Sequence, residues 1–144
     1  MRMSEEFKRF NYLMGETTAL YHDFAARAGL SDSVMWILYT ICEQGDGCSQ
    51  SEICRLCGMS RQTVNSAIRK LERGGLLYLE AGQGRNTGVF LTAAGRALAG
   101  ETVLPLMALE NEVLDGWTAD ERRALLRLTQ KYLEDLQAKL SAGR

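Results

Sequence analysis

The sequence lacks long hydrophobic runs, and this absence excludes a membrane-spanning protein. No apolar stretch approaches the roughly 18 residues that a transmembrane helix requires. The first ten residues, MRMSEEFKRF, also lack the apolar region of a signal peptide. We therefore expect a cytoplasmic protein with no membrane partner.

A strong excess of charge of either sign is also missing. The 17 basic and 18 acidic residues give a net charge of −1, which is not the strongly basic balance of a nonspecific nucleic-acid binder. The distribution is uneven, however, because residues 60–86 hold five basic side chains against two acidic ones. A basic segment in a neutral chain is typical of a protein that binds nucleic acid at one defined surface and releases counterions there.

Histidine occurs only once, at His22, so the usual histidine-based metal cluster cannot form. We expect His22 to lie on a helix surface or at a subunit interface. The sequence also lacks a convincing pair of nucleophile and base and has no phosphate-binding loop. It therefore predicts that the protein is not an enzyme and has no metal or other cofactor.

Cysteine is present, but its spacing does not complete a metal site. Cys54 and Cys57 form a C-x-x-C pair, whereas a structural zinc site needs a second such pair or two histidines. For these two thiols we favour a role as small apolar core residues. Cys42 and Cys48 flank a glycine-rich turn, where we expect greater exposure. A sensor of oxidants or electrophiles that uses one of these two thiols is an alternative, as is, more generally, a thiol- or metal-responsive sensor.

What the sequence does contain is ordinary for one globular domain: 144 residues, 46% apolar and 24% charged. Its most informative stretch is residues 49–77, SQSEICRLCGMSRQTVNSAIRKLERGGLL, which predicts two short helices joined by a tight turn. Ser49 and Glu52 form a capping box that begins the first helix, and Gly58 ends it. The apolar edge expected for this helix consists of Ile53, Leu56 and Cys57.

The second helix has two chemically different faces. Ser60 is a good N-cap, Gly74 and Gly75 end the helix, and the stripe that should face the core is Val64, Ala67, Ile68 and Leu71. The opposite face carries guanidinium, amide and hydroxyl groups that can pair with base edges or phosphates. We predict DNA contacts from Ser60, Arg61, Gln62, Thr63, Asn65, Ser66, Arg69 and Lys70. A merely solvated face is the simpler alternative.

A β-hairpin follows directly and favours the DNA-binding interpretation. Residues 76–81 form a strand-like run, 82–88 a glycine-rich loop and 89–91 a returning strand. Two helices around a glycine turn, followed by a hairpin, predict a winged helix-turn-helix. Arg85 and Asn86 lie at the tip of the loop, where a guanidinium suits the minor groove of DNA. The alternative for Arg85 is an ordinary loop charge.

The segment LERGGLL, a wing with Gly-Arg-Asn at its tip and the segment FLTAAGRAL resemble those of the MarR family of bacterial transcriptional regulators. The resemblance covers nearly the whole chain. It implies a repressor that binds a pseudo-palindromic site in double-stranded DNA as a homodimer and is released by a small-molecule effector. The wing of that family usually carries an aspartate two residues before its arginine, whereas this chain has Gln83 there.

The resemblance also implies an effector crevice between the dimerisation helices and the DNA-binding helices. Candidate lining residues are Tyr12, Trp36 and Tyr39. Plain core packing is the alternative for each of them. A winged helix used for protein–protein contact rather than for DNA is a further alternative for the whole molecule.

The flanking segments predict helices. Residues 5–28 carry an apolar stripe rich in phenylalanine, and residues 31–42 are apolar nearly all round and should be buried. Thr92 should cap a helix that runs to about Trp117 and is kinked, not divided, at Pro105. A capping box at 118–121 should begin a last amphipathic helix.

We therefore expect a mainly α fold with a small hairpin, in a single domain that spans residues 1–144. Residues 31–91 should form the DNA-binding lobe, and residues 1–30 and 92–144 a helical dimerisation lobe. Two DNA-recognition helices can lie one DNA turn apart only in a two-fold dimer, which agrees with the division into a DNA-binding lobe and a dimerisation lobe.

Overall fold

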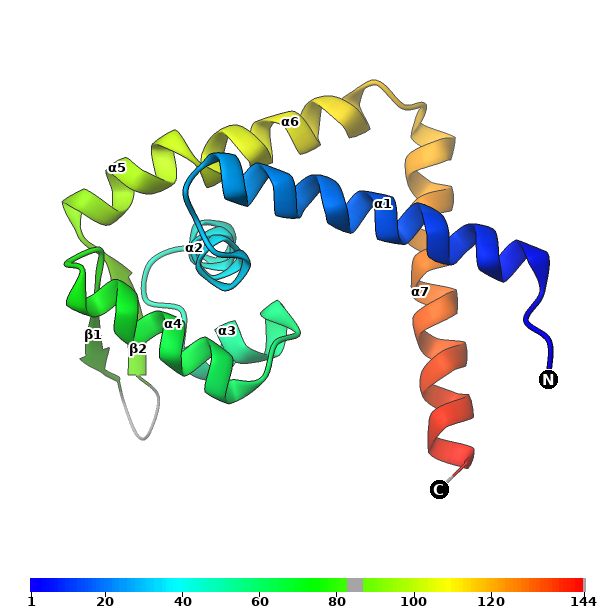
Figure 1. Cartoon of the computed structure of the whole chain (residues 1–144), viewed down its shortest axis with the longest axis horizontal. Coiled ribbons are helices and arrows are strands. Elements are labelled where there is room, and N and C mark those ends of the chain that lie inside the picture. Colours follow the sequence, from blue (N-terminus) through cyan, green and yellow to red (C-terminus); the bar gives the residue numbers. More distant parts are fainter. Residues whose placement is uncertain (83–86, 144) are drawn as a thin grey trace. The chain divides into compact units, whose positions relative to one another are not determined.

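The computed structural model describes residues 1–82 and 87–143. Its elements follow the chain in the order α1 (Glu5–Arg27), α2 (Asp32–Gln44), α3 (Gln50–Cys57), α4 (Arg61–Arg73), β1 (Leu77–Ala81), β2 (Thr87–Leu91), α5 (Ala93–Glu101), α6 (Val103–Asp115) and α7 (Ala119–Ala142) (Figure 1). The predicted class, mainly α with one hairpin, is confirmed. The chain divides into two compact units, Met1–Pro105 and Leu106–Arg144.

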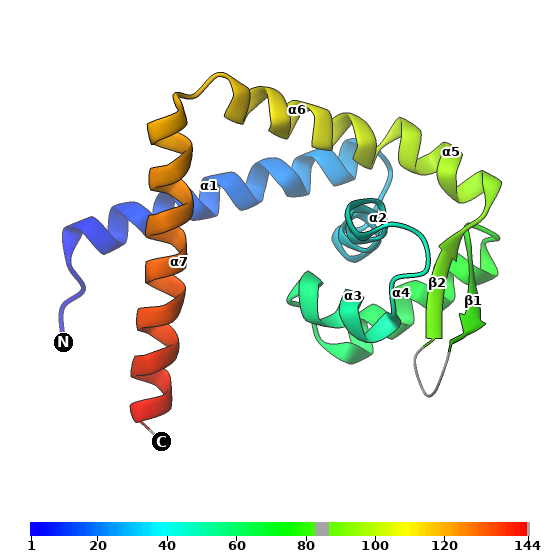
Figure 2. The same ribbon diagram turned by 180° about the vertical axis from the view of Figure 1, so that it is seen from behind.

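The core of the first unit is built around α2. The α2 side chains Met35, Ile37, Leu38 and Ile41 are each at most 1% exposed, so the prediction that this segment is buried is confirmed. α2 is seen end-on between α1 and α5 on one side and α3 and α4 on the other (Figures 1 and 2). The predicted stripe of α4 completes this core with Val64, Ala67, Ile68 and Leu71, all buried.

The helix-turn-helix forms through the predicted caps. Ser49 Oγ accepts from the Glu52 amide at 3.1 Å, and the Glu52 carboxylate accepts from the Ser49 amide at 2.8 Å. Gly58 ends α3 with a φ of 64°, in the left-handed region that glycine adopts without strain. The expected apolar edge of α3 is wrong at Leu56, which is 41% exposed. Ile53 and Cys57, one turn apart, share the inward face, and Leu56 lies beside it.

The hairpin is longer than predicted. β1 pairs antiparallel with β2 from Leu77 opposite Leu91 to Ala81 opposite Thr87, so β2 begins two residues before the expected position. Ser49 forms an additional β-bridge with Gly88, next to a hydrogen bond of 2.9 Å that the Val89 amide donates to the Cys48 carbonyl oxygen. Gly88, which was predicted to lie in the loop, is part of β2. Because glycine has no side chain, the backbone of the segment before α3 can approach the strand closely at this position.

The single kinked helix expected around Pro105 is wrong, because the chain forms two helices that separate at Thr102. Thr102 has φ −124° and ψ −82°, outside helical geometry. Proline has no amide hydrogen and its ring clashes with the carbonyl four residues earlier, which is that of Glu101. Separation at Thr102 places Pro105 in the first turn of α6, where amides lack helical partners and proline is tolerated.

Two long helices carry many exposed apolar side chains. In α1 only Ala25 is buried, although the helix has 23 residues. In the second unit, α7 buries none of its 24 residues. Among the described residues, no helix is both long enough and apolar enough to span a bilayer.

Candidate nucleic-acid interface

The polar face of α4 lies on the surface of the first unit. Its N-cap Ser60 accepts from the Thr63 amide at 3.1 Å, and its buried stripe fixes which side turns outward. The cationic end of the helix carries Lys70 and Arg73 in the last turn, where they complement the helix dipole. The exposed predicted residues are Ser60, Arg61, Gln62, Thr63, Ser66, Arg69 and Lys70.

Asn65 differs from the other residues of this face because it is only half-exposed. Its Oδ1 accepts a hydrogen bond from Gln50 Nε2 of α3 at 2.8 Å. Gln50 was not predicted as part of the site. It is the first residue after a helix cap and has no local feature that distinguishes it from an ordinary polar surface residue.

Two surface hollows border the polar face of α4. One, of about 160 Å³, lies between α3, α4 and β2 and is lined by Gln50, Ser51, Cys54, Arg61, Asn65 and Thr87. The other, of about 400 Å³, lies between the start of α2 and α4 and is lined by Ser31, Ser33, Val34, Gln62, Thr63, Ser66, Ala67 and Lys70. Hydroxyl, amide and cationic groups thus surround α4, and all of these can donate to phosphate oxygens.

The predicted contacts from the wing lie outside the described residues. They are Arg85 and Asn86, and Gln83 lies in the same gap. The described hairpin ends at Ala81 and resumes at Thr87, one of the residues that line the smaller hollow.

One of the four cysteines, Cys48, is less exposed than expected. Cys48 is 8% exposed, so the expectation that it is accessible in its glycine-rich turn is wrong. Its backbone pairs with β2, which carries the side chain inward, and burial raises the pKa of its thiol to about 11. Burial also raises the pKa of Cys42 and of Cys57. Neutral thiols are poor nucleophiles and poor metal ligands.

Cys57 of α3 contacts Thr40 of α2. Its sulfur lies 3.2 Å from Thr40 Oγ1. Cys54 and Cys57 are both half-buried, so the expectation that they are core residues is wrong; the buried side chain of α3 is Ile53. Among the described residues, no three histidine, cysteine, aspartate or glutamate side chains are grouped so that they could hold a metal ion.

The structure brings together two of the three predicted effector-crevice residues. The Trp36 and Tyr39 rings of α2 meet at a centroid distance of 5.4 Å, and Tyr21 of α1 lies 5.1 Å from Trp36. Tyr12 is not part of this cluster: it is 55% exposed and stacks with Arg9. Nine residues of helix, roughly 13 Å, separate Tyr12 from Tyr21. Tyr21, whose ring packs against Trp36, was not among the predicted crevice residues.

His22 connects α1 to the start of α2 on the surface of the first unit. Its Nδ1 lies 2.9 Å from an oxygen of Asp32. This hydrogen bond, together with the negative charge of Asp32, raises the pKa of His22 above its ordinary value of 6.5. The expected helix-surface position is confirmed.

The comparisons with known proteins agree in one family. The sequence profile of the MarR family matches residues 28–85. The HTH-type transcriptional repressor Rv2887 of Mycobacterium tuberculosis is 34% identical over 94 residues, which span 64% of this chain and 68% of that protein.

Two solved structures are similar over nearly the whole chain. NMB1585, a MarR family regulator from Neisseria meningitidis, gives a TM-score of 0.85 at 17% identity, over 98% of this chain and 100% of its own. The S. aureus MepR–DNA complex gives a TM-score of 0.74 at 21% identity, over 92% and 99%. At these identities the two structures establish a likeness of fold.

Proposed function

This chain belongs to the MarR family of transcriptional regulators, and we propose that it is a repressor that binds a pseudo-palindromic site in double-stranded DNA as a homodimer. The observation that carries this proposal is the division of α4 into a fully buried apolar stripe and an exposed polar face. A helix held in this way can enter the major groove, where arginine pairs with guanine and amides pair with adenine. The solved MepR–DNA complex, which shares the fold, supports the same assignment.

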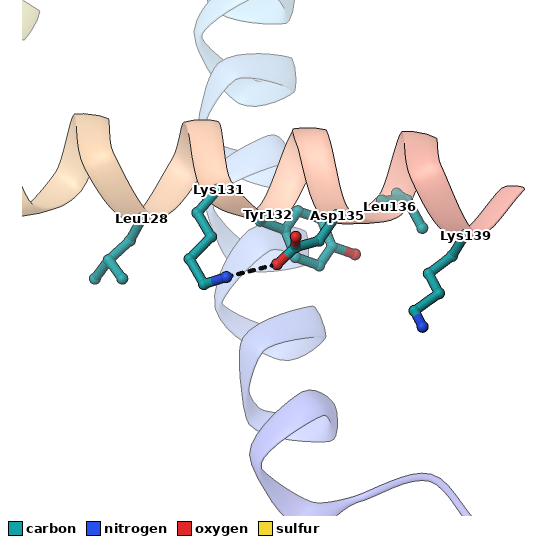
Figure 3. Close-up of a pocket in the computed structure, with 6 residues that line it drawn as sticks. All are labelled: Leu128, Lys131, Tyr132, Asp135, Leu136 and Lys139. Atoms are coloured by element: carbon teal, nitrogen blue, oxygen red, sulfur yellow. Dashed lines mark hydrogen bonds and ion pairs between the residues drawn. The ribbon is translucent and has the colours of Figure 1, made fainter. Parts of the chain in front are cut away.

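A homodimer is supported by the exposed apolar surface of α7. Leu128, Tyr132 and Leu136 line one side of the helix with Lys131 and Lys139 (Figure 3). Their exposed fractions are 53%, 42% and 41%, unusual for large apolar side chains that recur at helical spacing. Contiguous exposed apolar surface of this kind marks an interaction site, and a second copy of the chain supplies the matching surface by two-fold symmetry.

We also propose release from DNA by a small-molecule effector bound at the aromatic cluster of Tyr21, Trp36 and Tyr39. Trp36 and Tyr39 are half-buried, so the cluster offers ring surface to a ligand. An effector acts only if it binds the DNA-competent and DNA-free conformations with different affinities. In a Trp117→Phe variant, Trp36 is the only tryptophan, so a compound that lowers DNA affinity should also change its fluorescence.

The DNA proposal is tested by selecting duplexes from a randomised pool and measuring their affinity by fluorescence anisotropy at several salt concentrations. We expect a pseudo-palindrome with half-sites about 10 base pairs apart. Arg61→Ala and Arg69→Ala should each weaken binding. If the lost contact is to a phosphate, the salt slope should fall by about 0.9, and if it is to a base, sequence preference should relax.

Arg127→Ala serves as the matched control, because Arg127 is exposed on α7 and is not one of the predicted DNA contacts. The DNA affinity and the salt slope of the Arg127→Ala variant should equal those of the parent. A parent that selects no sequence and binds DNA no better than the Arg61→Ala and Arg69→Ala variants would overturn the proposal. Such a result would favour a winged helix used for protein contact.

A further inference from the structure

One contact on the polar face of α4 joins two side chains from different helices. Gln50 of α3 donates through Nε2 to Oδ1 of Asn65 of α4 at 2.8 Å. Both residues are half-buried, whereas Arg61, Gln62 and Ser66 beside them are exposed. The side chain of Asn65 is therefore already held in place before any complex forms, whereas the side chains of its exposed neighbours are not held in this way.

The direction of this hydrogen bond determines whether Asn65 presents a donor or an acceptor to a ligand. A carboxamide has one acceptor oxygen and one nitrogen with two donor hydrogens. With Oδ1 engaged by Gln50, the Nδ2 hydrogens are the groups that Asn65 can turn towards a ligand. The hollow that the two amides share measures about 160 Å³, far more than the roughly 10–15 Å³ needed to hold one water molecule, so a base edge can approach from the solvent side.

We propose that Gln50 is a positioning residue that sets the base preference of Asn65. This inference rests on the proposed DNA-binding function. At the exocyclic position in the major groove, guanine and thymine present a keto oxygen as an acceptor, whereas adenine and cytosine present an amino group as a donor; the N7 acceptor is common to both purines and does not distinguish them. An asparagine held with its donor facing that exocyclic position selects a keto base there. Gln50 thereby contributes to specificity through Asn65, without any contact of its own to a base.

A Gln50→Glu substitution tests the proposal because a carboxylate can only accept. Asn65 must then donate Nδ2 to Glu at position 50 and turn Oδ1 outward. Selection from a randomised duplex pool should show a change from keto to amino bases at one position of each half-site. The ratio of the two base types should change about fivefold or more, the lower end of what one good base contact supplies.

Two further variants separate this effect from added charge. Ser51→Glu places a carboxylate in the same hollow, on the next residue of α3, without replacing the partner of Asn65. It should weaken binding to all sequences and leave the selected motif unchanged. Gln50→Met removes the hydrogen bond without adding charge and should relax the keto preference. In an Asn65→Ala background, substitutions of Gln50 should no longer alter the motif.

The outcomes are distinct. A Gln50→Glu variant that behaves like Ser51→Glu, with weaker binding and the parental motif, would overturn the role of Gln50. If the parent selects no motif, the proposed function itself fails. The side-chain amide resonances of the free protein then decide the pairing: those of Asn65 should shift in Gln50→Glu and not in Ser51→Glu. Resonances unchanged in both variants would overturn the inference.

Discussion

Gly95 is the residue at which the described backbone leaves least room. A Cβ atom built there would lie 1.9 Å from the carbonyl oxygen of Leu76. That oxygen accepts from the Thr92 amide at 3.1 Å, and the Thr92 hydroxyl donates to the Gly75 carbonyl at 2.6 Å. Neither backbone segment can therefore move away without breaking the junction between the hairpin and α5.

Gly95→Ala should lower the free energy of unfolding by about 1–3 kcal/mol, the usual range for forced overpacking. Denaturant unfolding at fixed protein concentration measures this change. Gly100→Ala, in the same helix, is the matched control, because its Cβ would meet nothing within 4 Å. It should stabilise the protein by about 0.5–1 kcal/mol, since alanine replaces an exposed helical glycine. Equal stability of the two variants would contradict this account of Gly95.

His22 provides a pH-dependent contribution to stability. Because its hydrogen bond to Asp32 raises the pKa of the folded state above 6.5, the folded protein favours the protonated ring. The contribution is therefore fully present below about pH 6.5 and is lost as pH rises through the folded pKa. Both side chains are more than half exposed, so the effect on stability should be small.

NMR titration measures this pKa directly, because the chain has one histidine and its ring resonances need no assignment among several. The His22 pKa should lie above 6.5 in the parent and fall in an Asp32→Asn variant. The stability difference between the parent and His22→Gln should shrink as pH rises above that value. A parental pKa at or below 6.5 would show that the ion pair does not form in solution.

Single-residue roles could be predicted only where the determinant is local. The caps Ser49 and Ser60 and the stripe from Val64 to Leu71 depend on spacing along the chain, and all are as expected. The burial of Cys48 and the pairing of Gln50 with Asn65 depend on residues 15 or more positions away. Nothing within a few residues of Cys48 or Gln50 encodes those partners.

The division between α5 and α6 is the clearest result at the scale of elements. Pro105→Ala restores an amide that can donate to the Glu101 carbonyl and removes the ring clash. If proline causes the separation, Thr102 should acquire helical backbone chemical shifts in the variant. Stability should change by less than about 1 kcal/mol, because the proline already occupies a tolerated first-turn position.

The competing explanation for this division is the packing of Thr102 itself. Its side chain is 5% exposed, and its hydroxyl donates to the Leu98 carbonyl at 2.6 Å. Thr102 shifts that stay non-helical in Pro105→Ala would assign the separation to this packing. The sequence predicted the disturbance, because proline effects are local. It did not predict two helices, since that outcome also depends on where Thr102 is buried.

For the whole molecule, the order of elements was the strongest signal in the sequence, and the MarR resemblance drawn from it is confirmed. Two short capped helices and a hairpin are specified by local periodicity, so the winged helix could be predicted. The partner of α7 could not be identified in the same way. An amphipathic stripe shows that a surface must be covered, but not whether the same chain or another copy covers it.

The homodimer is therefore the last prediction. The 16.0 kDa chain should sediment with twice its monomer mass at micromolar concentration. Replacing Leu128 and Leu136 together by alanine removes apolar area from one side of α7 and should move the equilibrium towards the monomer by tenfold or more. Gln130→Ala, on the opposite side of the same helix, should leave the mass unchanged.

The same variants connect assembly to DNA binding. A monomer carries one α4, so it can occupy only one half-site and loses the second set of contacts. The Leu128→Ala, Leu136→Ala protein should therefore lose affinity for the full pseudo-palindrome and keep its affinity for an isolated half-site. A parental monomer that binds the full site with high affinity would contradict both the dimer and the role assigned to α7.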